Sequence, residues 1–286
     1  MALRKTRTYQ VDFYRVEQVD VDDTDLVRNL LKNHVNGHAP AHCIDNNANI
    51  QFQIRDIAVA SQDANIYKGV FGRLRHNETP EQASATGADA DVQLLPGHGL
   101  VEKNYFLFFS DLNLIAFHRN AHAGRNSHLQ AYLNSPQFAQ ISLTQILTTD
   151  SYSKLLNGDA LKKVEISLRK PAAALHQEDS FLSPLINQFQ GHKPGHMKVV
   201  LSAEKGGSLP AELKESLIKL ARFGRTRVAR ASLVDDTLVD LLMDRLVGNF
   251  VADLQSNGRT LPTHMFAGIA SAKDECADDL ENFFHP

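Results

Sequence analysis

Two apolar runs in the middle of the chain, separated by four turn-forming residues, place the strongest limit on the fold. They lie within Tyr105–His118, and the residues between them are Ser110, Asp111, Leu112 and Asn113. Short apolar runs bounded by turn signals are typical of fully buried strands. The segment therefore predicts a β-hairpin in the core of the protein.

Other segments carry the alternation of a half-buried strand. Ile50–Ala60 alternates clearly, and Ile66–Arg75 is its expected partner across a polar turn. The segment between them and the core hairpin, residues 77–98, is rich in Ala, Asp, Gly, Thr and Pro, which predicts a mobile loop. Further strands are expected at residues 11–16, 141–148, 161–169, 197–203 and 227–234.

Helices are expected where apolar residues recur at helical spacing. Leu26, Leu30, Leu31 and Val35 follow a run of capping residues and predict a helix there. Pro210 is suited to the first turn of another helix, because its missing N–H is not needed there. Further helices are expected at residues 129–138, 150–156, 182–189 and 267–284.

One apolar segment, residues 239–254, is ambiguous between a helix and a hairpin. Gly248 and Asn249 stand where a turn would fall, and they favour the hairpin. The alternation of strands and helices predicts an α/β (α+β) fold with mixed sheets, flanking helices and a C-terminal helix. A break at Gln190–Pro194 divides the expected domains into residues 1–190 and 195–286.

Composition favours a soluble cytoplasmic protein with a sizeable core. Hydrophobic residues make up 43% of the 286 residues. The basic N-terminus is not followed by the apolar stretch of a signal peptide. No segment approaches the roughly 18 apolar residues of a membrane span, so direct membrane insertion is not expected. Cys43 and Cys276 lie far apart and fit no metal spacing, which favours reduced thiols.

The main cluster of positive charge lies in the segment KLARFGRTRVAR. The net charge of −3 argues against a uniformly basic nucleic-acid binder, but a local basic face remains possible. Arginine binds phosphate through its bidentate guanidinium. The alternative is a solvated helix end, where cations are favoured by the helix dipole. The candidate DNA-binding residues in this segment are Lys219, Arg222, Arg225, Arg227 and Arg230.

A second basic set is distributed over two segments. HRNAHAGRNSH contains Arg119 and Arg125, and LKKVEISLRK ends in Arg169 and Lys170. The first segment also holds three histidines, at positions 118, 122 and 128, but no carboxylate stands among them to orient a metal ligand. A polar loop or a contact to a nucleic-acid backbone is favoured over a metal site, and no metal or other cofactor is expected.

Catalytic motifs are weak. Glu165 lies on an expected strand near lysines, but a metal-dependent nuclease needs two or three acids around its ions. The Walker-type, dinucleotide-binding and nucleophile-elbow motifs are absent. His42, Cys43 and Asp45 are neighbours in sequence only, which does not make a triad. We therefore expect no catalytic residue.

The order of elements resembles the RexA-like phage-exclusion proteins. Several segments are similar to family segments and follow in the same order. They are VDFYRV with the LVRNLL helix, YFLFFSDLNLIAFHRN with HLQAYL, LKKVEISLRKP, HMKVVLSAE and RVARASLVDD. The same arrangement is similar to the DNA-binding effector of the Kiwa anti-phage system. The resemblance covers most of the chain as a patterned similarity rather than a single motif.

The resemblance implies a non-enzymatic sensor or effector of bacterial anti-phage defence that binds double-stranded DNA without sequence preference. It also implies a homodimer formed through the C-terminal part, a DNA-contacting region around Arg227 and Arg230, and a membrane-protein partner. Two alternatives stay open. One is a metal-dependent DNA nuclease centred on Glu165, and the other is a protein-interaction module that binds no nucleic acid.

Overall fold

The computed structural model describes residues 5–18, 26–36, 44–47, 50–60, 63–76, 81–83, 87, 89–95, 98–134, 141–169, 196–222, 226–242 and 245–284. The chain divides into two compact units. The first comprises Met1–Val11, Val16–Ser142 and Asn249–Lys273, and the second comprises Asp12–Arg15, Leu143–Gly248 and Asp274–Pro286.

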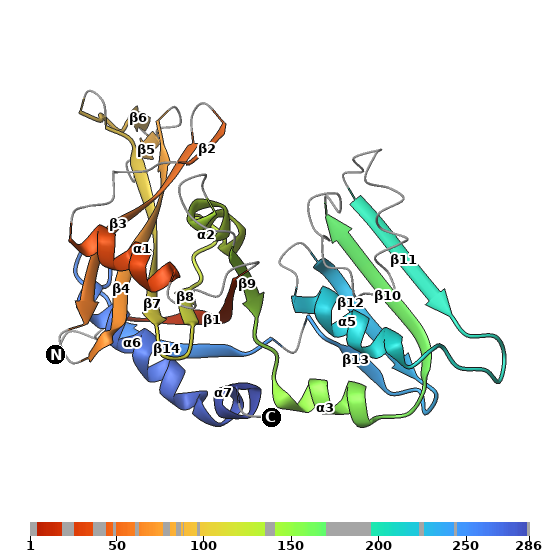
Figure 1. The fold of residues 1–286 in the computed structure, drawn as a ribbon. Helices are drawn as coiled ribbons and strands as arrows, with labels where there is room; N and C mark the ends of the chain where they lie inside the picture. The colour runs from red at the N-terminus through yellow and green to blue at the C-terminus, as the bar shows by residue number, and fades with distance from the viewer. Residues whose placement is uncertain are drawn as a thin grey trace. The chain divides into compact units, whose positions relative to one another are not determined.

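Among the described residues, eight strands form the larger sheet (Figure 1). They are β1 (Thr6–Gln18), β2 (Ile44–Asn47), β3 (Ile50–Ala60), β4 (Asp63–Arg75), β7 (Leu100–Phe109), β8 (Leu114–His118), β9 (Ile141–Gln145) and β14 (Val247–Asp253). Seven lie in the order β14-β1-β8-β7-β4-β3-β2, and β9 pairs with β1. The expected pairing of β3 with β4 is confirmed, and it is antiparallel.

The core hairpin predicted at Tyr105–His118 is confirmed as β7 and β8. The two strands are antiparallel, with Phe106 opposite Phe117 and Phe109 opposite Leu114. All five residues of β8 are buried. Asn113 turns the chain with a φ of 48°, a left-handed conformation that asparagine tolerates better than most residues. The hairpin thus supplies the buried centre of the larger sheet.

Two helices pack against β3 of this sheet, α1 (Leu26–Val35) and α2 (Asn126–Leu133). Both were expected from their apolar spacing, and both bury that face. In α2, Tyr132 is fully buried and its ring meets the ring of Phe71 edge-on, with 5.9 Å between centroids. Burial of such aromatic side chains contributes roughly 1.5–3 kcal/mol each.

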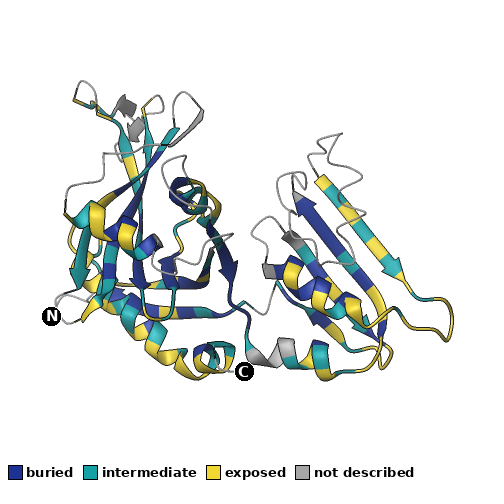
Figure 2. Cartoon of the chain, viewed as in Figure 1, coloured by how far each residue is buried: buried dark blue, intermediate teal, exposed yellow. Residues whose placement is uncertain are grey.

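The second unit contains a four-stranded antiparallel sheet in the order β11-β10-β12-β13. Its strands are β10 (Leu161–Arg169), β11 (His196–Ser202), β12 (Thr226–Leu233) and β13 (Leu238–Asp240), and its helices are α3 (Thr149–Asn157) and α5 (Glu212–Arg222). Apolar side chains of the helices and of one sheet face form a single core cluster. Residues of β11 alternate between exposed and half-buried (Figure 2), as expected when one face of a sheet meets solvent.

The C-terminal helix predicted at 267–284 is two helices. The first is α6 (Pro262–Glu275), and the second is α7 (Ala277–Phe284). Cys276 separates them, and Asp278 and Asp279 lie in the first turn of α7. Acidic residues favour a helix N-terminus, so Asp278 and Asp279 suit the start of a second helix.

The hairpin predicted at residues 239–254 is wrong. Its first two residues belong to β13, which pairs with β12 of the small sheet, and its second half is β14 of the larger sheet. Gly248 and Asn249 lie within β14, where burial alternates residue by residue. The turn signal was misleading because each apolar half completes a different sheet.

The remaining expectations from the sequence either meet a different structure or lie outside the described residues. The segment 77–98 contains a two-stranded pair, β5 (Glu81–Ala83) and β6 (Asp89–Asp91). The expected helix at 182–189 and the boundary at 190–194 lie outside the described residues. The units differ from the ranges 1–190 and 195–286, because β10 pairs with both β11 and β12 across that boundary.

Lys214 of α5 provides a test of how the second unit is held together. Its Nζ donates hydrogen bonds to the carbonyl oxygens of Leu156 and Gly158 at the end of α3, at 3.3 and 2.8 Å. We expect Lys214→Met to lower the free energy of unfolding by about 1–2 kcal/mol, because those carbonyls lose a charged donor. Urea denaturation measures this, and Lys219→Met, on the exposed side of the same helix, is the control. Equal stability of the two variants would contradict the assignment.

Candidate functional site

The main basic cluster predicted from the sequence is divided by the core of the second unit. α5 buries Leu217 against the sheet and exposes Lys219 on its outer side. In β12, Ala229 and Ala231 face the same core, so Arg230 between them points from the other face. Lys219 and Arg230 therefore lie on opposite sides of the core layer.

The other members of that cluster are only partly described. Arg222 is the last residue of α5, and Arg227 lies in β12. The side chains of both lie outside what the structure describes, and Arg225 lies outside the described residues altogether.

Arg230 forms an ion pair with a carboxylate. Its Nε donates to Oδ2 of Asp240 at 2.5 Å, and the two residues face each other across β12 and β13. This hydrogen bond, together with the charge of Asp240, raises the pKa of Arg230. A phosphate would have to compete with Asp240 for this guanidinium.

Glu165 lies on the same sheet face and is also paired. Its Oε1 is 2.7 Å from Nζ of Lys198, and it stands opposite Arg230 in the register of β10 and β12. The hydrogen bond from Lys198 lowers the pKa of Glu165. Within the described part of the chain, no group of three His, Cys, Asp or Glu residues is placed to hold a metal ion. The arrangement therefore gives no support to a nuclease centre.

The second basic set is also divided between the two units. Arg169 is the last residue of β10 in the second unit; its side chain is not described, and Lys170 lies outside the described residues. Arg119 and Arg125 belong to the first unit, where they begin and end the segment between β8 and α2. We call this segment, residues 119–125, the basic loop. Both arginines are exposed.

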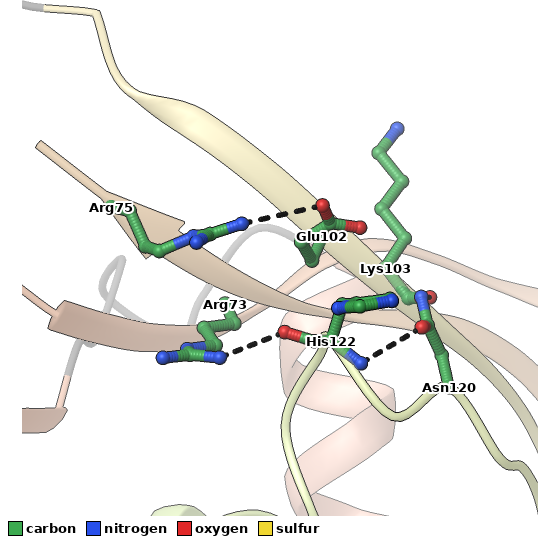
Figure 3. A network of polar contacts seen from close by, with 6 residues as sticks. All are labelled: Arg73, Arg75, Glu102, Lys103, Asn120 and His122. Atoms are coloured by element: carbon green, nitrogen blue, oxygen red, sulfur yellow. Dashed lines mark hydrogen bonds and ion pairs between the residues drawn. The ribbon is translucent and has the colours of Figure 1, made fainter. Parts of the chain in front are cut away.

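Polar contacts hold the basic loop to the larger sheet (Figure 3). Asn120 donates from Nδ2 to the carbonyl oxygen of Lys103 on β7 at 3.1 Å, and its Oδ1 accepts the N–H of His122 at 3.1 Å. Arg73 on β4 donates from Nη1 to the carbonyl oxygen of His122 at 2.9 Å. Arg119 donates from Nη1 to Oε1 of Gln10 on β1 at 3.2 Å. The loop is therefore bound to three strands.

Gly124 lets the loop lie directly on the aromatic core. A Cβ at this position would stand 2.5 Å from Cε1 of Phe71 and 3.2 Å from Cδ1 of Phe52. Phe71 is fully buried, and Phe52 almost so. These rings cannot move aside, so the backbone needs glycine here. Ala123 beside it is also buried.

His128 ties the end of the loop to the first turn of α2. Its Nδ1 accepts a hydrogen bond from the N–H of Arg125 at 3.0 Å. The N–H of His128 donates in turn to the carbonyl oxygen of Arg125, also at 3.0 Å. The first of these bonds is one half of a capping box, with histidine in the place of the usual Glu or Gln, and the second is a backbone turn bond. The ring of His128 stacks on Phe52 with 4.1 Å between centroids. Burial, followed by the charges of Arg125 and Arg73, lowers the pKa of His128.

The cations around the loop are not all equivalent. Arg75 donates to Glu102 at 3.5 Å, which partly neutralises both. The side chain of Lys103 points away from Arg73 and Arg75 in Figure 3. No ion pair joins Arg73 or Arg125 to a carboxylate among the described residues. Arg73, Arg119, His122 and Arg125 together form what we call the basic surface.

Sequence reasoning found two of the three arginines in the basic surface and missed Arg73. Arg73 lies in GRLR on β4, and the alternation of that strand places it on the same face as Phe71. Nothing in the sequence links β4 to the loop that follows β8, because that contact depends on the order of strands in the sheet.

The three histidines do not converge. His118 is buried, with its ring 5.3 Å from that of Tyr9 and 6.1 Å from that of Tyr105. His122 is exposed on the loop, while His128 stacks on Phe52. The Nδ1 atom of His118 is buried without a hydrogen-bond partner. Burial, then the charge of Arg7, lowers the pKa of His118 to about 4.

Gly124→Ala tests the close approach of the loop. We expect the free energy of unfolding to fall by about 1–3 kcal/mol, because the added methyl group collides with a ring that cannot move. Chemical denaturation measures the change. Gly207→Ala is the control, since a Cβ there meets its nearest atom at 3.4 Å, an ordinary contact. Equal effects of the two substitutions would mean that the loop is not seated on Phe71.

His118 predicts a pH dependence of stability. Its folded pKa, about 4, lies below its ordinary value of 6.5, so the unfolded chain binds the proton more tightly. Its contribution is complete above about pH 6.5 and is lost as the pH falls through about 4, by on the order of 3 kcal/mol. Urea titrations across this range should show a steeper loss for the natural chain than for His118→Leu. Parallel curves for the two proteins would show that His118 is not buried as described.

None of the helices in the described part of the chain has the length and apolar character needed to cross a membrane.

Comparison with known proteins identifies a family of unknown function. No curated protein matches the sequence. One family model matches residues 4–261, which is most of the chain and includes the basic loop, the larger sheet and the small sheet. The chain therefore belongs to DUF6731, a family of unknown function.

Proposed function

We propose that this protein binds the phosphate backbone of double-stranded DNA at the basic surface, without reading base sequence. The observation that carries the proposal is the hydrogen bond from Arg73 of β4 to the carbonyl oxygen of His122, which binds Arg73 to the loop that ends at Arg125. The charges of both arginines also lower the pKa of His128. Two arginines from distant parts of the sequence are thus brought to the same loop.

Charge and geometry both favour phosphate as the ligand of this area. Guanidinium groups bind phosphate oxygens in pairs, and each contact releases counterions from the DNA. The chain has a net charge of −3, so attraction to DNA depends on such a local concentration of cations. The contacts that hold the loop also hold Arg119 and Arg125 at its two ends, which lowers the entropy lost on binding.

The basic surface is preferred over the sheet face of the second unit. There, Arg230 is paired with Asp240 and Lys198 is paired with Glu165. Breaking such pairs offsets part of the energy gained from a phosphate. In the basic surface, the acceptor of Arg73 is the backbone carbonyl oxygen of His122, which carries no charge.

The resemblance to phage-exclusion proteins supports duplex DNA as the specific ligand. On that ground, we propose a role as a non-enzymatic, cytoplasmic sensor or effector in anti-phage defence, acting as a dimer with a membrane-protein partner. The alternative of a nuclease at Glu165 is not proposed, since the Glu165 carboxylate is bound by Lys198.

Two double variants that remove equal charge separate the two basic regions. Arg119→Gln/Arg125→Gln removes two cations of the basic surface, and Lys219→Gln/Arg230→Gln removes two from the second unit. We expect the first pair to weaken binding of a labelled duplex by about tenfold or more and to lower the salt slope by about two. The second pair should change both far less. Fluorescence anisotropy across a salt series measures both quantities.

The same titrations decide between the alternatives. Equal losses in the two double variants would show that binding follows net charge rather than the basic surface. The absence of binding at low salt in the natural protein would overturn the proposed function. Cleavage of the duplex in the presence of Mg²⁺, seen on a gel of the same samples, would restore the nuclease alternative.

A further inference from the structure

The cap at the start of α2 requires one protonation state of a single histidine. Nδ1 of His128 accepts the N–H of Arg125, and only an unprotonated nitrogen accepts a hydrogen bond. The ring proton of the neutral form is therefore on Nε2. A second proton would have to enter at Nδ1, and it would remove the acceptor that the cap uses.

Within the described part of the chain, the two charges that act on the pKa of His128 are both positive. Arg125 belongs to the loop that the ring caps, and Arg73 comes from β4. Phe52 of β3 covers one face of the ring and carries no charge. In the protein without a ligand, a protonated His128 would be a third cation beside two guanidiniums, and part of its charge would be removed from water. This arrangement disfavours the protonated form of His128 and lowers its pKa.

A phosphate group at the basic surface reverses that balance. Its negative charge would lie against Arg73 and Arg125, the two groups that repel the proton. With their charges offset, protonated His128 becomes an additional attraction for the phosphate rather than an additional repulsion. The energy of this attraction opposes the loss of the cap hydrogen bond.

We propose that His128 couples proton uptake to phosphate binding at the basic surface, so that DNA binds more tightly as the pH falls below neutrality. This rests on the proposed function, because the phosphate in question is that of DNA. His128 acts as a positioning residue for the loop in its neutral form, and as an added cation beside the phosphate in its protonated form.

Linkage fixes the sign and the limit of the effect. The pKa of His128 lies below its ordinary value in the protein alone, and bound phosphate raises it. Between the two values, each binding event takes up a proton. Because coupling is reciprocal, affinity rises by at most about tenfold for each pH unit that the solution falls.

The test needs a variant that keeps the cap but does not titrate. His128→Gln provides it, because glutamine at this position of a capping box accepts the same backbone N–H. His264→Gln is the matched control, since it removes an exposed histidine of α6 that is not part of the basic surface. Comparison with it separates His128 from the general gain in positive charge that every exposed histidine gives at low pH.

Affinity for a labelled duplex is measured by anisotropy from about pH 7.5 to about pH 5.5 at constant ionic strength. Each protein's affinity at the upper pH is its own reference. The natural chain and His264→Gln should gain several-fold more affinity over this range than His128→Gln. Calorimetry in buffers of different ionisation heat should show fewer protons taken up per duplex by His128→Gln.

The outcomes separate this inference from the proposed function. Binding with the same pH dependence in the natural chain and His128→Gln would overturn the coupling and leave DNA binding intact. No binding at any pH would overturn both. If His128→Gln does not fold, the imidazole resonances of the natural protein are titrated with and without the duplex. An unchanged pKa of His128 would then overturn the coupling.

Discussion

The close contact between Gly124 and the rings of Phe71 and Phe52 determines where the basic surface lies. Without a side chain, Gly124 brings the loop backbone down onto the aromatic core, and α2 starts directly after it. Arg125 is then next to the ring of His128, which rests on the same Phe52. The position of Arg73 follows from the same packing, because Phe71 lies two residues earlier on the same strand. An apolar contact thus positions a charged surface.

The two units show different ways of placing a cation on a sheet. On the exposed face of the small sheet, cross-strand neighbours are of opposite charge, as with Arg230 and Asp240. Such pairs favour the register of the strands and leave little charge to attract a ligand. At the basic loop, Arg73 is instead held by an uncharged carbonyl oxygen. Its charge is not offset by that acceptor, which is one reason why we propose DNA binding there.

Local patterns predicted the strands and helices well, and they failed where distant segments meet. The core hairpin, β3 with β4, and α1 were evident because each pattern lies within one short segment. The cluster around Arg230 looked continuous in sequence, but a helix and a strand packed on one core place its ends on opposite sides. Arg73 was missed for the converse reason, since only the strand order β8-β7-β4 brings it to the basic loop. The Gly248–Asn249 signal failed because pairing with β1 outweighed a local turn.

The order of strands in the larger sheet also limits how far this sheet can form while the chain is being synthesised. β14 pairs with β1, although the whole of β10 to β13 is synthesised between them. During translation, the β1 edge that receives β14 stays open until the ribosome has passed residue 253. An open edge of this kind is prone to wrong pairing, with other nascent chains or with itself. The small sheet has no such dependence, because its last strand, β13, precedes β14, so all of its strands are synthesised before the larger sheet can be completed.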